Sequence, residues 1–194
     1  MNKRCWLTVI AIGLVALVQG CSLKTQNLHL DPALRASGPS VGNGALIGLS
    51  VKDARADKKL GEVGDPNTKM VDVRLDEDFG PTLYNRLSNA LSERGFRIVP
   101  YSDAMTRTLQ VEVRRLELSS IKQPFQFETE LRAEVAALAR GENESFDRLF
   151  YVRTYKESAG PPYHKDSNAL VNSAVSRALE DMVSDERLLD MLSR

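Results

Sequence analysis

The stretch FQFETELRAEVAALA, residues 125–139, alternates between apolar or small side chains and charged ones. One face would carry Phe125, Phe127, Thr129, Leu131, Ala133, Val135 and Ala137, and the other Glu128, Glu130, Arg132 and Glu134. A period of two residues is typical of a β-strand, because successive side chains point to opposite faces of a sheet. The pattern therefore predicts a half-buried antiparallel strand, with one face on a core and one in water.

Further strands are predicted on both sides of this stretch. Residues 108–120, TLQVEVRRLELSS, alternate in the same way except for a phase slip at Arg114 and Arg115, which indicates a β-bulge. Residues 146–158 return after the turn RGENES, and shorter strands are expected at residues 46–51 and 96–101. Gly61 and the sequence Gly64-Asp65-Pro66-Asn67 predict turns.

Two helices complete the predicted fold. Leu83, Leu87 and Leu91 recur every four residues over about residues 80–94, with Pro81 suited to the first turn and Gly95 to the end. The acidic residues Asp76, Glu77 and Asp78 precede this helix, where its dipole favours anions. A final helix is expected to be capped by Asp166 or Ser167, with an apolar face of Leu170, Ala174, Ala178 and Met182. We predict an α+β fold, a mainly antiparallel sheet of four to five strands with two helices packed on one face.

The N-terminal stretch LTVIAIGLVALVQGCSLK, residues 7–24, predicts a secretory leader. As a helix its apolar run would be roughly 20 Å long, short of the ~30 Å hydrocarbon core of a membrane. Lys3 and Arg4 precede the run and Gly20 follows it, as in a signal peptide. Residues 17–21 also resemble the bacterial lipobox, which implies that residues 1–20 are a signal peptide, that Cys21 is lipidated, and that Ser22 directs the protein to the outer membrane.

These boundaries define the predicted organisation of the chain. Residues 21–44 are expected to be the lipidated cysteine and a flexible tether, because Gly, Ser, Pro and Asn crowd this segment. A short strand is predicted within it at Asn27 to Asp31. Residues 45–194 are expected to form a single α+β domain.

The charge balance argues against nucleic acid as a partner. The chain has 26 basic and 26 acidic residues, and removing residues 1–20 takes away only Lys3 and Arg4, which leaves a net charge of −2. Nucleic-acid binding needs a basic surface that displaces counterions from phosphates. We therefore expect no nucleic-acid partner.

The residue inventory gives no pattern for catalysis, a metal or a cofactor. His29 and His164 are the only histidines, whereas a zinc site needs three or four His, Cys or carboxylate ligands. The sequence lacks the G-x-S-x-G elbow of a serine hydrolase, so His164 with Asp166 and Ser167 is better explained as a loop and a helix cap than as a triad. We predict a non-enzymatic protein without a cofactor or metal.

Asp53 and Arg55 are the candidate partner-binding residues. They lie two positions apart at the end of a predicted strand, so their side chains should share one face. They could form an ion pair at the strand exit, or Arg55 could present its planar fork to a partner's carboxylate or a lipid phosphate while Asp53 orients it. The sequence does not separate these alternatives.

Several segments together resemble the YajG family of bacterial lipoproteins. The lipobox is followed by the V-x-D-x-R pattern of Val51, Asp53 and Arg55, by ERGFRIV at residues 93–99, and by NALVNSAVSRALEDMVSD at residues 168–185. The resemblance implies an uncharacterised, periplasm-facing lipoprotein of α+β fold. It brings no established activity, ligand or catalytic residue.

Three functions stay open at this stage. The favoured one is an interaction or scaffold module, anchored in the outer membrane through its lipid and bound to another envelope protein. The alternatives are a carrier that binds a lipid or other hydrophobic ligand, and an unrecognised hydrolase. A large apolar cavity between helices and sheet would favour the carrier.

Overall fold

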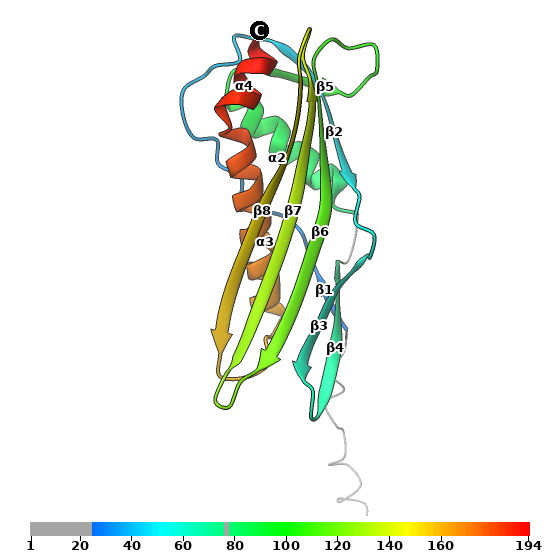
Figure 1. Cartoon of the computed structure of the whole chain (residues 1–194), viewed down its shortest axis with the longest axis vertical. Coiled ribbons are helices and arrows are strands. Elements are labelled where there is room, and N and C mark those ends of the chain that lie inside the picture. Colours follow the sequence, from blue (N-terminus) through cyan, green and yellow to red (C-terminus); the bar gives the residue numbers. More distant parts are fainter. Residues whose placement is uncertain (1–24, 76–77) are drawn as a thin grey trace, which may run out of the picture.

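The computed structural model describes residues 25–75 and 78–194, which form one curled sheet with helices against one face (Figure 1). The strands are β1 (Gln26–Leu28), β2 (Leu46–Asp53), β3 (Lys59–Asp65), β4 (Lys69–Leu75), β5 (Arg97–Pro100), β6 (Thr108–Lys122), β7 (Phe127–Arg140) and β8 (Ser145–Ser158). The described helices are α2 (Gly80–Glu93), α3 (His164–Val183) and α4 (Glu186–Ser193).

The sheet is mixed and has eight strands, where the sequence predicted a mainly antiparallel sheet of four to five. Its order is β1-β4-β3-β6-β2-β5, with β7 also paired to β6 and β8 paired to β7. β6 joins both parts, because β7 runs antiparallel to it along one edge while β2 and β3 pair parallel to it along the other. The predicted α+β class is confirmed, but the parallel pairs enlarge the sheet and make it mixed.

β3 and β4 form a hairpin where the sequence predicted only turns, at Gly61 and at residues 64–67. Gly61 and Gly64 lie within β3 at φ values of +149° and +142°, and only Pro66 to Thr68 form the connection. A Cβ on Gly61 would lie 1.9 Å from the carbonyl oxygen of Leu118 on β6. Glycine is therefore needed here because β3 approaches β6 closely, not because the chain turns.

Helix α2 matches its prediction. Leu83, Leu87 and Leu91 are fully buried, and Gly95 ends the helix at φ +89°. The buried leucines follow from the four-residue spacing, which places all three side chains on the face toward the sheet. Of the predicted acidic residues before the helix, Asp76 and Glu77 lie outside the described residues.

The predicted final helix is interrupted. Helix α3 begins at His164, ahead of the predicted caps Asp166 and Ser167, and it has no side-chain cap. It ends at Val183, and α4 starts after Asp185, whose carboxylate accepts a hydrogen bond of 2.9 Å from the backbone N–H of Leu188. This new cap allows α4 to turn and bury its own apolar face, so the described residues contain three helices rather than two.

The long strands β6, β7 and β8 behave as the alternation predicts, with two corrections on β7. The pairing of β6 with β7 shifts between Val113 and Arg115, which confirms the bulge. On β7, the predicted core face from Phe127 to Ala137 is buried, but Glu130 of the predicted solvent face is also buried, at 8% exposure. Phe125 is 96% exposed because the strand begins only at Phe127. The helices cover one face of these strands, and the opposite face is left to solvent (Figure 1).

Residues 25–44 belong to the folded unit, in contrast to the flexible tether predicted for residues 21–44. β1 confirms the predicted short strand and pairs parallel with β4, and Leu28 and Leu30 are buried at 0% and 2% exposure. The backbone around His29 is held by the side-chain amides of Asn168 and Asn172, at 2.8 Å each. The composition was misleading because the few apolar side chains of this segment reach the core. The predicted leader and Cys21 lie outside the described residues.

Candidate functional site

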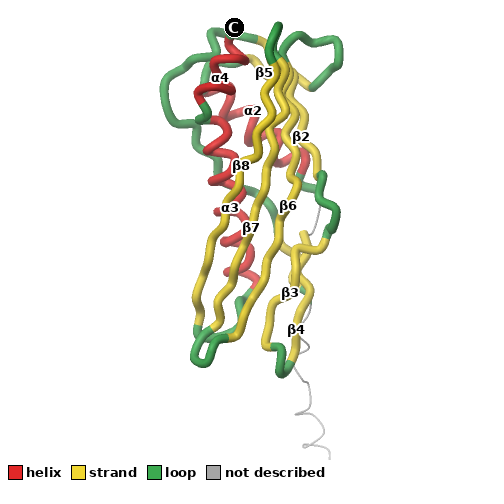
Figure 2. Tube along the Cα trace, viewed as in Figure 1, coloured by secondary structure: helices red, strands yellow, loops and turns green. Residues whose placement is uncertain are grey.

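The edge of β6 is left unpaired where β2 ends and β3 begins. The last contact of β2 runs from the N–H of Ala54 to the carbonyl of Val113, at 3.0 Å, and the first paired residue of β3 is Gly61, opposite Leu118. No described strand pairs with this edge of β6 over residues 114–117. Figure 2 shows β2 beside the upper half of β6 and the β3–β4 hairpin beside its lower half.

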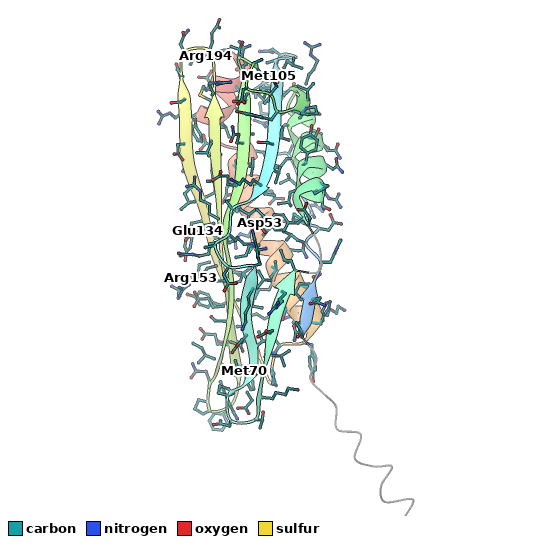
Figure 3. The ribbon with its side chains drawn as sticks, turned by 90° about the vertical axis from the view of Figure 1, so that its right-hand side faces the viewer. Asp53, Met70, Met105, Glu134, Arg153 and Arg194 are labelled. Atoms are coloured by element: carbon teal, nitrogen blue, oxygen red, sulfur yellow. The ribbon has the colours of Figure 1, made fainter. Side chains whose placement is uncertain are left out.

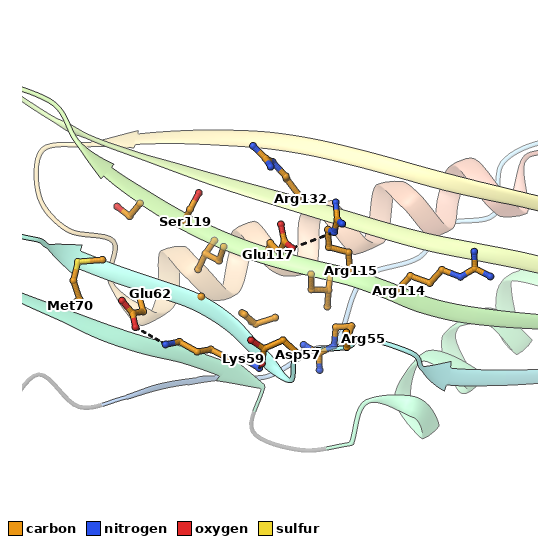
Figure 4. A pocket seen from close by; sticks show the side chains of 16 residues that line it. Arg55, Asp57, Lys59, Glu62, Met70, Arg114, Arg115, Glu117, Ser119 and Arg132 are labelled. Carbon is orange, nitrogen blue, oxygen red and sulfur yellow. Dashed lines mark hydrogen bonds and ion pairs between the residues drawn. The ribbon is translucent and has the colours of Figure 1, made fainter.

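A groove of about 770 Å³ opens at this gap (Figure 4). Leu60, Leu116 and Leu118, each 2% exposed, supply its apolar lining. The charged residues that line it are Arg55, Asp57, Lys59, Glu62, Arg114, Arg115, Glu117 and Arg132. The groove thus combines an apolar lining with charged groups and an adjacent unpaired backbone edge. We call it the β6 groove.

The bulge in β6 explains why two consecutive arginines line the groove. An extra residue between the paired positions Val113 and Arg115 breaks the alternation, so Arg114 and Arg115 are both exposed, at 40% and 46% of their side chains. Arg115 Nη1 lies 2.9 Å from Glu134 Oε1, and its Nε lies 3.3 Å from Glu117 Oε1. Arg114 lies 3.1 Å from Glu112. The rim is therefore a set of exposed ion pairs, which exchange partners at little cost in free energy.

The predicted pair of Asp53 and Arg55 lies at one end of this groove. Arg55 Nε and Nη2 donate to the two carboxylate oxygens of Asp53 at 2.9 and 3.0 Å. Arg55 lines the groove but is only 7% exposed, and its guanidinium carbon lies 5.4 Å from the ring centre of Phe79. Asp53 thus occupies the edge of the guanidinium that carries Nε and Nη2, and Phe79 lies against its face, a geometry that favours the ion-pair alternative over direct presentation to a partner.

These contacts stabilise the ionised form of the Asp53 carboxylate. Burial raises its pKa, but the hydrogen bonds from Arg55 and from Lys58, whose Nζ lies 2.9 Å from Asp53 Oδ2, outweigh burial and lower the pKa to about 2. The carboxylate is therefore ionised at neutral pH. It fixes the end of β2 on one side of the β6 groove.

A second ion-pair cluster lies on the solvent face of the sheet beside the groove. Arg153 Nε and Nη2 donate to Glu130 at 2.6 and 3.0 Å, and Arg132 donates to the same carboxylate. The hydrogen bonds from Arg153 and then Arg132 lower the pKa of Glu130 to about 2. Figure 3 shows Arg153 and Glu134 on this face, where Tyr155 also stacks on Arg153 at 4.9 Å.

His164, Asp166 and Ser167 are not arranged as a triad. His164 Nε2 lies 2.6 Å from the carbonyl oxygen of Asn27, while Asp166 pairs with Lys156 at 2.6 Å. Ser167 is fully buried. Over residues 25–75 and 78–194, no group of three His, Cys, Asp or Glu side chains is placed to hold a metal ion.

The sequence located the Asp53–Arg55 end of the groove but missed Arg114, Arg115, Glu117 and Arg132. The phase slip at Arg114 and Arg115 was visible as a bulge. Its connection to a groove was not visible, because the gap depends on two other strands that stop at either side of the bulge.

Comparison with known proteins identifies the family. Residues 32–193 match the model of a family described as "Uncharacterized lipoprotein". The chain belongs to this lipoprotein family. This is consistent with the resemblance to YajG-like lipoproteins, and no curated protein matches the sequence.

Solved structures are similar to the lipoprotein at low sequence identity. One uncharacterised protein has a TM-score of 0.50 at 13% identity, over 82% of this chain and 97% of that one. A putative neuraminyllactose-binding hemagglutinin homolog from Helicobacter pylori has a TM-score of 0.41 at 10% identity, over 81% of this chain and 95% of that one. A hypothetical protein from Chlamydia trachomatis has a TM-score of 0.40 at 8% identity, over 77% and 98%. The first of these shows a common fold.

Within residues 25–75 and 78–194, no helix combines the length and the apolar character needed to cross a bilayer.

Proposed function

We propose that this lipoprotein is a non-enzymatic interaction module of the cell envelope, held in the outer membrane by lipid on Cys21 and facing the periplasm. The lipobox-like leader and the membership of a lipoprotein family support the anchor. The family is described only as uncharacterised lipoproteins, and the surface of the folded part supports the role proposed for it.

The observation that carries the proposal is the unpaired edge of β6 at residues 114–117. Four residues of strand are about 13 Å long. An extended segment of another envelope protein can therefore enter the β6 groove and add backbone hydrogen bonds between the ends of β2 and β3. Strand addition of this kind draws its affinity from the main chain, and the groove side chains select the sequence.

The charged rim specifies the chemistry of the partner segment. Arg114 and Arg115 are 40% and 46% exposed and are held only by surface ion pairs, so an incoming carboxylate can replace Glu112 or Glu117. The apolar lining from Leu60, Leu116 and Leu118 suits an alternating segment with an aliphatic side chain directed inward. We propose an extended, alternating apolar and acidic segment as the occupant.

The carrier alternative has less support from the described hollows. A site for a hydrophobic ligand needs predominantly apolar walls. The β6 groove is lined by eight charged residues, and a second hollow of about 550 Å³ is lined in part by Arg94, Glu186 and Asp190. Both hollows suit polar contacts better than a lipid tail.

Site-directed crosslinking in cells tests the docking site. A photoreactive amino acid at Glu117, which lines the groove and is 56% exposed, should give one defined protein adduct. The same probe at Arg187, which is exposed on α4, should not give this adduct. An Arg114→Glu and Arg115→Glu double variant should abolish the adduct. Equal adducts from both probe positions, or an adduct that persists in the double variant, would contradict docking in the groove.

The anchor has its own test. Wild-type cells should incorporate labelled palmitate into the protein and retain it in the outer-membrane fraction, and the Cys21→Ala variant should do neither. A Cys21→Ala variant that labels normally would contradict lipidation at this residue. The result does not depend on the groove.

A further inference from the structure

The end of the molecule that carries the β6–β7 hairpin displays an unusual set of exposed apolar side chains. We call it the hairpin end; it is the lower end in Figure 1, where the β3–β4 turn and the connection from β8 to α3 also lie. Phe125 is 96% exposed and Tyr163 75%, the two highest values among the large hydrophobic residues described, and Ile121 is 55% exposed. These three residues contribute nothing to the core.

The strand register brings the segments that carry these residues together. Phe127 pairs with Lys122 of β6 on one side and with Ser158 of β8 on the other. The hairpin closes with a hydrogen bond of 2.7 Å from the N–H of Gln123 to the carbonyl of Gln126, so Phe125 lies at its tip, beyond the last strand pair. Ser158 is the last residue of β8, level with Phe127 and Lys122, and the chain continues from it to Tyr163. The exposed side chains therefore share one end of the sheet.

The N-terminal side of the folded chain enters at this end as well. Gln26 Nε2 donates to the carbonyl of Pro162 at 3.1 Å, and His164 contacts the carbonyl of Asn27. Five residue steps separate Cys21 from Gln26, which is at most about 18 Å of extended chain. This inference rests on the proposed anchor: if Cys21 is lipidated, the hairpin end cannot move far from the membrane surface.

Two lysines near this end are paired with carboxylates. Lys122 lies 2.5 Å from Asp65, and Lys156 lies 2.6 Å from Asp166. This pairing reduces the attraction of these two lysines for anionic headgroups, whereas exposed aromatic side chains favour the interface between headgroups and acyl chains. The surface is thus suited to apolar insertion rather than to charge-driven binding.

We propose that the hairpin end docks on the bilayer that holds the lipid anchor, with Phe125, Tyr163 and Ile121 inserted at its interface. The occupant of this surface is a lipid membrane. Docking would fix the orientation of the domain, because the long strands would then point away from the membrane surface. Glu117 lies five residues from the end of β6, so the β6 groove is held roughly 17 Å above the contact and faces the periplasm.

Fluorescence quenching in vesicles tests the docking. Trp6 is the only tryptophan of the chain and lies within residues 1–20, the signal peptide that the mature acylated protein has lost, so each substitution introduces a single reporter. The acylated protein carries Phe125→Trp, or Tyr151→Trp as a matched control that is 51% exposed on β8. Each is reconstituted into phosphatidylethanolamine vesicles that contain bromine-labelled phosphatidylcholine. We expect strong quenching of Phe125→Trp and none of Tyr151→Trp, with no change when phosphatidylglycerol is added.

The outcomes separate this inference from the anchor on which it rests. Both reporters are exposed, so neither substitution disturbs the core, and flotation of the vesicles is measured in the same samples. A chain that floats without quenching of Phe125→Trp retains the anchor and overturns the docking. Equal quenching of both reporters also overturns it, because the domain would then lie on its side. A chain that does not float contradicts both proposals.

Discussion

Replacing Asp53 by asparagine keeps the shape of the side chain but removes the charge that faces the buried Arg55. The Arg55 side chain is 4% exposed and makes two hydrogen bonds to this carboxylate, at 2.9 and 3.0 Å. Removing one partner of a buried ion pair costs about 3–5 kcal/mol, because the other charge stays buried and unpaired. The Asp53 side chain is 21% exposed, so solvent reaches the pair and we expect the lower end, about 3 kcal/mol.

This loss should appear in the free energy of unfolding. Urea denaturation followed by circular dichroism at pH 7 measures it directly, and the melting temperature should fall by about 6–12 °C for a protein of this size. Asp72→Asn is the matched control, because Asp72 pairs with Lys59 at 2.6 Å on the surface and should cost much less. Adding Arg55→Met to Asp53→Asn should restore part of the stability, since no charge is then left buried.

The result decides between the two interpretations of Asp53 and Arg55. A loss below about 1 kcal/mol would mean that the pair is worth no more than a surface ion pair, and the argument from burial would be wrong. If Asp53→Asn costs this little stability but abolishes the crosslinked adduct, the pair would act directly in binding the partner.

Three further predictions test the packing and the electrostatics. Gly61→Ala should destabilise the protein by about 2 kcal/mol or more in urea denaturation, because its Cβ would lie 1.9 Å from the carbonyl oxygen of Leu118, whereas Gly160→Ala, with no atom within 4 Å, should change stability by less than about 0.5 kcal/mol. Equal effects would contradict the close approach of β3 to β6. Folding lowers the pKa of Glu130 from 4.5 to about 2, so its contribution is complete above pH 4.5 and is lost as the pH falls toward 2; Glu130→Gln should reduce this part of the pH dependence of the unfolding free energy. Leu87→Asp should lower stability by about 4 kcal/mol or more by placing a charge in the core, and unchanged thermal unfolding would mean that the face of α2 is misassigned.

The elements that the sequence predicted well are those with a local repeat. Alternation over residues 127–137 and 146–155 placed β7 and β8 and the faces they bury, and the leucines of α2 identified its buried side. These patterns are readable because each element must turn its own apolar side chains one way, whatever it packs against. The bulge at Arg114 and Arg115 was readable for the same reason, as a break in that repeat.

Only the tertiary structure decided which strands pair and where the groove opens. β2 and β3 both pair with the same edge of β6, more than fifty residues further along the chain, and the unpaired residues 114–117 exist only because these two strands stop short of each other. Gly61 looked like a turn residue in the sequence. The actual reason for glycine there, the close carbonyl oxygen of Leu118, lies on another strand. Residues 25–44 looked like a tether, because the core that takes up Leu28 and Leu30 is built by the rest of the chain. Backbone N–H and C=O groups are the same at every residue, so a local side-chain pattern marks a strand but does not specify its partner.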